Sequence, residues 1–370
     1  MERKISDDIR FIVSMLQQKK LAEIHAFLGF DACIDNIVRI VNGKNENDET
    51  RFFSNSRQFG EFLISRENKS CGIELRTQQS KIGGNMVITG NALGNLGIKA
   101  ECIGTFGLPE VLPIFRSMST NCKLYTVGET ITTSALEFND AKVMMFDPGP
   151  YDKLNWNGIV ELLGIERIKQ LISDKQLVSF LNWSEIIRST DIWQGILEEI
   201  LPLATIPAVN PYFFADFSDC SRRSKEEIQS AIGLLSGFKK YFKVIVSLNQ
   251  NEAEIIANAL DLPHNKLDES FVKRMFNSCM TDILIVHRTK DALAYDGSTF
   301  EKCDTFFCKE PTILTGGGDN FNAGFCFARF CDLDLFQSLI VANAVSGYYV
   351  RTGISPDVGK LVEFLNQINK

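Results

Sequence analysis

The second half of the chain alternates short apolar runs with longer segments whose apolar residues recur at helical spacing. The runs predict strands at 177–183, 244–248 and 283–287, and the segments between predict helices at 189–201, 224–237 and from 250. Parallel strands need long crossover connections, and the helices that supply them cover both faces of the sheet. This rhythm predicts an α/β protein, a three-layer α/β/α sandwich with a mostly parallel central sheet. Ligands of such sheets bind at the carboxyl ends of the strands.

The bulk composition excludes several classes of protein. A formal net charge of -7 argues against a nucleic-acid partner, and no apolar run reaches the length of a membrane span. The N-terminus lacks the apolar core of a signal peptide. The 10 cysteines include no C-x-x-C pair, so we expect free thiols in a reducing compartment. The chain is therefore predicted to be cytoplasmic, with neither a nucleic-acid nor a membrane partner.

Three consecutive glycines, Gly316, Gly317 and Gly318, precede Asp319 and an apolar segment at helical spacing. Glycine adopts backbone angles closed to other residues and lets a ligand approach the main chain. The pattern predicts a tight turn that opens a buried helix near Asp319, where unpaired amides attract anions. A carboxylate beside bound phosphate can take the proton of an attacking hydroxyl, while the amides stabilise the developing charge.

The glycine turn also fits a simpler structural role. An isolated Gly-Gly-Gly-Asp is equally compatible with a simple helix cap at Asp319. The turn is not a P-loop, because no Gly-Lys-Ser or Gly-Lys-Thr follows it, and it lacks the G-x-G-x-x-G spacing of a dinucleotide fingerprint.

The turn and its helix resemble the second signature of the ribokinase family of sugar kinases, also called the PfkB family. In that family a Gly-Ala-Gly-Asp turn opens a helix near the C-terminus, and its Asp is the catalytic base. The resemblance implies a single ribokinase-like kinase domain over residues 1–370, with Asp319 as the base and the amides of residues 316–318 as the anion hole.

An earlier segment, which begins at Gly83 and Gly84, is similar to the first signature of the same family: a Gly-Gly pair, a helix and a Leu-Gly stop. The pair would let the chain pass close to the sugar. Family members usually carry an Asn where this chain has Ile88, and Asn85 and Asn91 are the candidates to replace it. The resemblance thus implies substrate binding by Gly83, Gly84 and Asn85.

Two aspartates follow the first predicted strand, which ends at Gly29. In the family an Asp at this place binds the sugar hydroxyls, and Asp35 matches best by its Ile-Asp pair, with Asp31 as the second candidate. From this segment alone, a turn or capping residue is the preferred interpretation.

Asn249 and Glu252 resemble the N-x-x-E motif of the family, whose Glu acts through waters on the Mg²⁺ that accompanies the nucleotide. Magnesium keeps several waters and takes few protein oxygens. The same four residues also fit a capping box. Asn251 and Glu254 offer a second register.

Two further segments resemble nucleotide-binding parts of the family. A Thr-x-Gly-x-x-Gly loop is expected near residues 286–293, but Arg288 and Asp291 replace its glycines. Arg288 is then either a phosphate ligand or a solvated surface charge. Asn343 and Gly347 lie on a late helix similar to the one whose Asn lies beside the adenine.

The residues just before the glycine turn depart from the family. An Asp-Thr pair is usual there, and many relatives bind a monovalent cation beside it, whereas this chain has Ile313 and Leu314. An isoleucine side chain offers no oxygen ligand to a hard cation. We therefore expect no activation by potassium.

Two segments are expected to form a small β lid, at about 36–82 and 122–148. The first contains a long polar connection, and the second a predicted hairpin over 130–146 around Asn139 and Asp140. An edge hairpin of the main sheet is the alternative for 130–146. The resemblance also allows a homodimer formed through the lid.

These features lead to one predicted function and two alternatives. We expect an ATP- and Mg²⁺-dependent kinase that transfers the γ-phosphoryl group to a hydroxymethyl group of a small sugar. The first alternative is a nucleoside kinase of the same fold, of the adenosine type. The second is a degenerate kinase that only senses a sugar or nucleotide, a hypothesis motivated by the altered loops at 286–291 and 313–314.

Overall fold

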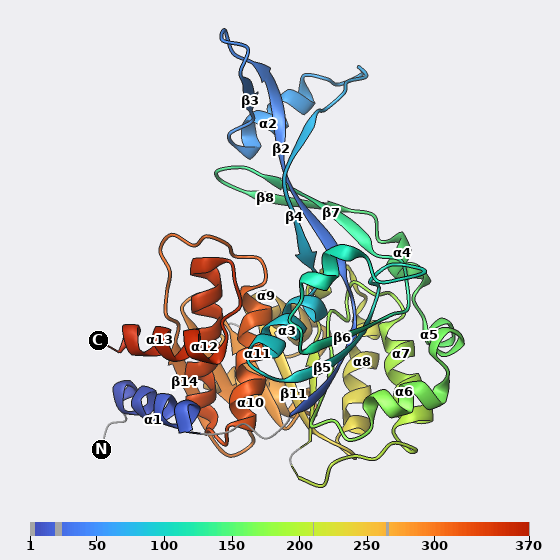
Figure 1. Cartoon of the computed structure of the whole chain (residues 1–370), viewed down its shortest axis with the longest axis vertical. Helices are drawn as coiled ribbons and strands as arrows, with labels where there is room; N and C mark the ends of the chain where they lie inside the picture. Colours follow the sequence, from blue (N-terminus) through green and yellow to red (C-terminus); the bar gives the residue numbers. More distant parts are fainter. Residues whose placement is uncertain (1–3, 19–23, 210, 264–265, 370) are drawn as a thin grey trace.

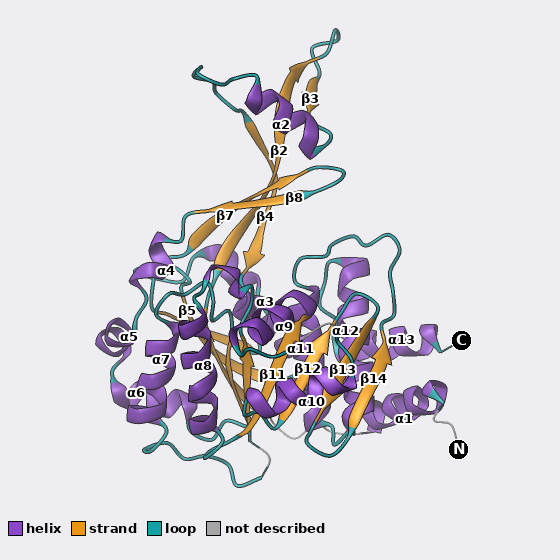
Figure 2. Ribbon diagram, turned by 180° about the vertical axis from the view of Figure 1, so that it is seen from behind, coloured by secondary structure: helices purple, strands orange, loops and turns teal. Residues whose placement is uncertain are grey.

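The computed structural model describes residues 4–18, 24–209, 211–263 and 266–369. The body contains one nine-stranded sheet between two layers of helices (Figures 1 and 2). Its strands are β1 (His25–Phe30), β5 (Lys99–Gly104), β6 (Cys122–Thr126), β9 (Leu177–Phe180), β10 (Tyr212–Asp216), β11 (Lys243–Asn249), β12 (Ile283–His287), β13 (Asp291–Tyr295) and β14 (Phe300–Asp304). Their order is β14-β13-β12-β11-β10-β9-β1-β5-β6. Strands from β6 to β12 pair in parallel, and β13 and β14 add antiparallel pairs.

Two groups of helices cover the two faces of this sheet. One face carries α1 (Ile5–Gln18), α3 (Asn85–Asn95), α11 (Gly317–Phe330), α12 (Leu335–Thr352) and α13 (Val358–Ile368). The other carries α4 (Gly149–Lys153), α5 (Trp156–Leu163), α6 (Ile165–Ile172), α7 (Ser189–Gly195), α8 (Lys225–Phe238), α9 (Gln250–Ala259) and α10 (Glu269–Ser278). Short 3-10 turns lie at Pro113–Ser117 and Cys220–Arg222, and a π-helical turn at Ile196–Ile200 extends α7. The predicted three-layer α/β/α sandwich is confirmed.

Alternation along each strand divides the core between the two layers. In β1, Ala26 and Leu28 pack with the first group of helices, whereas Phe27 packs with the second. Successive side chains of a strand point to opposite faces, so a strand covered on both sides is apolar at nearly every position. This explains the uninterrupted apolar runs of the sequence.

A second, five-stranded sheet projects from the body as a lid (Figure 1). It consists of β2 (Cys33–Lys44), β3 (Thr50–Phe52), β4 (Leu75–Gly83), β7 (Ile131–Glu137) and β8 (Lys142–Phe146), with α2 (Ser56–Ile64) packed at its tip. The long strand β2 pairs with β3, β4 and β7. A small apolar core of its own, built on Val38, Ile40, Phe53 and Leu136, supports the lid.

One predicted boundary of the lid differs from the structure. Residues 122–126, expected in the lid, form β6 at the edge of the main sheet, because they pair in parallel with β5 and Leu124 packs on the body core. The predicted hairpin over 130–146 is present as β7 and β8, and it belongs to the lid sheet. The first helix, α1, spans Ile5–Gln18, and residues 19–23 lie outside the described part. Within the described ranges, no helix has the length and apolar character needed to cross a bilayer.

Candidate active site

The glycine turn opens α11 as the sequence predicts. Gly316 has φ +91°, in the left-handed region that favours glycine, and α11 begins at Gly317. A Cβ atom on Gly316 would lie 2.8 Å from the hydroxyl of Tyr349, and one on Gly318 would lie 3.3 Å from His287. The turn therefore needs small residues, and it places a helix N-terminus at this point, which is the geometry of an anion site. Within the turn, Gly317 N already donates to the carbonyl of Leu314 at 3.1 Å.

Asp319, in the first turn of α11, belongs to a group of carboxylates at the carboxyl ends of the strands. Burial raises its pKa well above the ordinary value, and the carboxylates of Asp216, Asp31 and Glu252 raise it further. Asp216, at the end of β10, accepts a hydrogen bond from Asn322 Nδ2 at 2.9 Å, and burial raises its pKa to about 6. A basic carboxylate beside an anion site suits the removal of a proton from a hydroxyl.

One cavity of about 610 Å³ lies beneath the lid, on one side of the turn. Its walls include Asp35 and the predicted residues Gly84 and Asn85, together with Asn182 from the body and Thr315 from the turn. Gly83 lies behind them, where a Cβ atom would approach Asp35 to 2.7 Å. Carboxylate and amide groups in such a cavity can bind several hydroxyls at once, as a sugar requires.

The two aspartates after β1 have different positions. Asp35 faces this cavity, whereas Asp31 is fully buried behind it. The carboxylate of Asp31 accepts hydrogen bonds from the backbone N–H groups of Asn85 at 2.7 Å and Met86 at 2.9 Å. It also accepts one from Asn182 Nδ2 at 2.9 Å. Asp31 therefore holds the start of α3 in place, and Asp35 is the aspartate that a ligand can reach.

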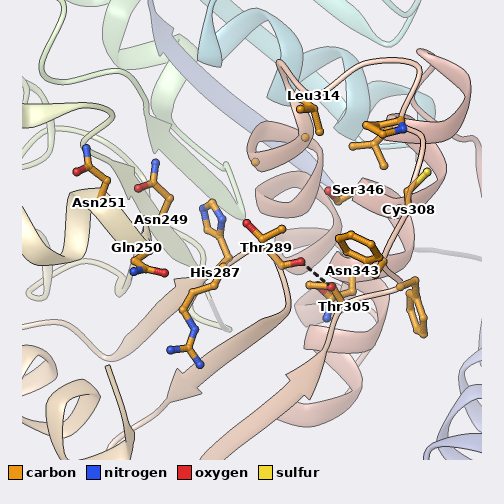
Figure 3. A pocket seen from close by; sticks show the side chains of 18 residues that line it. Asn249, Gln250, Asn251, His287, Thr289, Thr305, Cys308, Leu314, Asn343 and Ser346 are labelled. Atoms are coloured by element: carbon orange, nitrogen blue, oxygen red, sulfur yellow. Dashed lines mark hydrogen bonds between the residues drawn. The ribbon is translucent and has the colours of Figure 1, made fainter. Parts of the chain in front are cut away.

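A second cavity, of about 480 Å³, lies on the other side of the turn (Figure 3). In Figure 3, Asn249 stands on one side of it and Asn343 on the other, with His287 between. Gly317, Gly318 and Gly347 also line it. The predicted nucleotide residues Asn249 of β11, and Asn343 and Gly347 of α12, are thus brought together around the glycine turn.

Glu252 forms a capping box with Asn249 at the start of α9, which was the alternative role for this motif. Its carboxylate accepts Asn249 N at 2.8 Å and Asn249 Nδ2 at 2.6 Å, while Asn249 Oδ1 accepts Glu252 N at 3.0 Å. Burial, together with the nearby carboxylate of Asp216, raises the pKa of Glu252 to about 8. A carboxylate held at this energetic cost beside other carboxylates would be stabilised by a cation.

The donor set suits water-mediated magnesium better than direct ligation. Among the described residues, no group of three acidic, His or Cys side chains could hold a metal directly. Asp216 and Glu252 nevertheless offer oxygen atoms, and Mg²⁺ prefers oxygen and keeps its waters. The residues therefore fit a hydrated ion beside nucleotide phosphates.

Arg288 lines the second cavity, but its guanidinium is already engaged. Nε donates to Asp291 Oδ1 at 2.5 Å, and Nη1 donates to the carbonyl of Leu267 at 3.0 Å. Arg288, which replaces a glycine of the family loop, is thus held by contacts within the chain and is not a free phosphate ligand. Asn343 donates Nδ2 to the carbonyl of Asp304 at 3.3 Å, and its side chain still borders the cavity.

Sequence reasoning missed two residues beside the turn. His287, at the end of β12, lies against Gly318, and burial lowers its pKa to about 4. Lys142 of the lid strand β8 donates Nζ to Thr315 Oγ1 at 3.4 Å. His287 follows an apolar run, as strand-end site residues do, and this position could have signalled it. No local pattern marks Lys142, because 173 residues separate it from Thr315.

Comparisons with known proteins agree with this geometry. A family model for "prokaryotic ketohexokinase" matches residues 13–368. The chain is similar to a ketohexokinase of Haloferax volcanii, with 25% identity over 338 residues that cover 91% of this chain and 89% of that one.

Solved structures share the fold. The chain is similar to ribokinase from Thermotoga maritima, with 13% identity, a TM-score of 0.63 and coverage of 93% of this chain and 100% of the other. It is also similar to an Escherichia coli protein described as ribokinase II, solved in complex with ATP and Mg²⁺, with 12% identity, a TM-score of 0.62 and coverage of 94% and 100%.

The fold and the paired cavities define a sugar kinase of the ribokinase-like class. More narrowly, the chain belongs to the prokaryotic ketohexokinase family.

Proposed function

We propose that the chain transfers the γ-phosphoryl group of ATP to a hydroxymethyl group of a ketohexose. One observation carries the proposal: the glycine turn is the common wall of the two cavities. Thr315 lines the cavity beneath the lid, and Gly317 and Gly318 line the other. A hydroxyl in the first cavity and a phosphoryl group in the second can therefore meet beside Asp319. The family and its Haloferax relative support a ketohexose as the acceptor.

Each side of the turn has its own task in this proposal. Asp319 accepts the proton of the attacking hydroxyl, and the amides of residues 316–318 stabilise the transferring group. Asp35 and Asn85 orient the sugar hydroxyls, with Gly83 and Gly84 allowing close approach. Asp31 acts behind them by fixing the start of α3.

The nucleotide occupies the second cavity. Asn249, Asn343 and Gly347 border the nucleotide, and Arg288 contributes to the wall through its pairing with Asp291. Glu252 and Asp216 would hold Mg²⁺ through its waters. When bound, the ion neutralises charge on the phosphates. Closure of the lid excludes water, so that phosphate passes to the sugar.

The acceptor is tested with a substrate panel. Purified protein is assayed for ADP formation with Mg²⁺ and ATP in the presence of fructose, glucose, ribose or adenosine, and products are identified by mass spectrometry. We expect the highest kcat/KM with the ketohexose. A preference for adenosine would identify a nucleoside kinase, and binding without turnover of any acceptor would identify a sensor.

We also propose a cytoplasmic enzyme that forms a homodimer through its lid. Exposed apolar side chains at Val143, Met144 and Met145 on β8 support the dimer, because β8 is an edge strand of the lid sheet. Sedimentation of the wild type and of Met145→Lys tests it, since a buried charge would weaken the association.

A further inference from the structure

The guanidinium group of Arg223 lies inside the loop that joins β9 to α7. Four of its hydrogen bonds go to backbone carbonyls of that loop and a fifth goes to Glu227. The acceptors are Trp183 O at 3.2 Å, Ser184 O at 2.9 Å, Ile186 O at 2.6 Å, Ile187 O at 3.2 Å and Glu227 Oε1 at 2.9 Å. The side chain is only 5% exposed, and its guanidinium carbon lies 4.7 Å from the ring centre of Trp183. Arginine carries five N–H donors, and here each has an acceptor.

The loop held by Arg223 forms part of the cavity beneath the lid. Asn182 and Glu185 of this segment line that cavity. Asn182 has φ +56°, which is uncommon for a residue other than glycine and needs support from its surroundings. Its Nδ2 donates to Asp31, while its buried Oδ1 has no hydrogen-bond partner among the described residues. This oxygen is thus an unused hydrogen-bond acceptor in the cavity wall.

Arg351, near the end of α12, makes similar contacts on the nucleotide side. Its Nη2 donates to the carbonyls of Phe306 at 2.9 Å and Phe307 at 2.8 Å, and its Nη1 donates to Gly347 O at 2.7 Å. The guanidinium carbon lies 5.3 Å from the ring centre of Phe364. Phe306, Phe307 and Gly347 all line the second cavity. Arg351 therefore holds this part of the cavity wall in place through hydrogen bonds to its backbone carbonyls.

We propose that Arg223 and Arg351 are positioning residues, each of which fixes the loop that lines one of the two substrate cavities. Guanidinium is suited to this task because its planar fork reaches several carbonyls at once and always carries charge. A lysine keeps the charge but has a single nitrogen, so it cannot span the same carbonyls. The assignment of the two loops to sugar and to nucleotide rests on the proposed function.

The two arginines serve as controls for each other. In Arg223→Lys we expect KM for the sugar to rise about ten-fold, because several hydrogen bonds that hold the loop are lost, while KM for ATP stays within about two-fold. In Arg351→Lys the expected pattern is the reverse. Circular dichroism and melting curves check that both variants are folded. Equal changes of both KM values in each variant, or no change in either, would overturn the inference.

Amide hydrogen exchange tests the positioning without any turnover. Arg223→Lys should increase exchange in residues 182–188 and leave 305–310 unchanged, and Arg351→Lys should do the opposite. If both segments respond together, or neither responds, the arginines do not hold separate loops. A wild-type protein without kinase activity would refute the proposed function, and the exchange experiment would still decide this inference.

Discussion

At the scale of single residues, Asp319 lies in the first turn of α11 and carries a carboxylate with little exposure to solvent. The first feature suggests a helix cap, and the second suggests a general base. A helix cap needs only an acceptor atom, whereas a general base needs a carboxylate that can take a proton. Its pKa, raised by burial and by Asp216, favours proton uptake. The amide of asparagine preserves the shape and removes the basicity, so one substitution separates the two roles.

Asp319→Asn is expected to lower kcat by roughly 10²–10⁴-fold, because the attacking hydroxyl loses its base. The melting temperature should stay near that of the wild type, because any lost capping contact is offset by removal of a buried negative charge that the neighbouring carboxylates repel. Steady-state kinetics and calorimetry on the same preparation measure both. Activity close to wild type would mean that Asp319 only caps α11.

Glu252 is expected to make the ligand-free protein less stable as the pH rises. Its pKa is raised in the folded state from 4.5 to about 8, so between these values the folded chain binds more protons than the unfolded chain. The free energy of unfolding therefore falls with increasing pH across that window. Glu252→Gln should reduce this fall by about 1 kcal/mol or more at pH 8 relative to pH 5. Urea unfolding at the two pH values measures it, with Glu254→Gln on the same helix as the control.

The same variant tests the role of the metal. If Glu252 holds magnesium through water, Glu252→Gln should raise the Mg²⁺ concentration needed for half-maximal rate by roughly ten-fold at fixed ATP. Superimposable magnesium titrations would show that the capping box with Asn249 is its whole function.

At the scale of elements, the segment before α11 is ordered by the end of α12. The N–H groups of Thr312 and Ile313 donate to the carbonyl of Val350 at 2.8 and 3.2 Å, and the hydroxyl of Tyr349 donates to the carbonyl of Thr315 at 3.0 Å. These hydrogen bonds within the chain hold the turn in place.

Exchange of potassium for a large organic cation at constant ionic strength should therefore change the rate by less than about two-fold, because neither Ile313 nor Leu314 has an oxygen ligand in its side chain. The measurement is the initial rate at saturating sugar and ATP. A several-fold loss without potassium would mean that backbone carbonyls bind the ion after all.

The lid strand β8 brings a cation to the glycine turn through Lys142. The positive charge lies close to Thr315, where charge develops during transfer, so Lys142→Met should lower kcat by about 10²-fold. Thr315→Val is the matched control, since it removes the contact but keeps the charge. An equal loss in Thr315→Val would show that Lys142 only fastens the lid to the body.

At the scale of the whole molecule, the lid and the body have separate apolar cores. Phe53, in the lid core, is 5% exposed and lies 5.4 Å from the rings of both Phe59 and Phe62. Phe180 belongs to the body core, is fully buried and contacts Phe213 at 5.0 Å between ring centres. Loss of a lid contact can therefore be confined to local unfolding of the lid.

Phe53→Ala is expected to lower kcat/KM for the sugar while ATP binding and the main melting transition stay close to wild type. Phe180→Ala should instead destabilise the whole protein by about 3–5 kcal/mol. Calorimetry and titration with ATP distinguish the two. A comparable drop in melting temperature for both variants would show that the lid and body unfold as one unit.

The sequence by itself determined the layered fold and the start of α11 at the glycine turn. These features depend on local rules: apolar alternation, backbone freedom at glycine and the unpaired amides of a helix start. Asp319 could be placed at the site from the glycine turn itself, and Asn249 and Asn343 from their resemblance to motifs of the ribokinase family.

Only the tertiary structure decided which of two similar residues faces a cavity. Asp31 and Asp35 both follow β1, but the amides of α3 occupy Asp31 and leave Asp35 accessible. Arg288 is tied to Asp291, and Lys142 reaches Thr315 from the lid. Some of these contacts join residues far apart in the chain, and others distinguish between two nearby residues by how they pack. Local sequence spacing predicts neither kind, because both depend on the assembled sheet and lid.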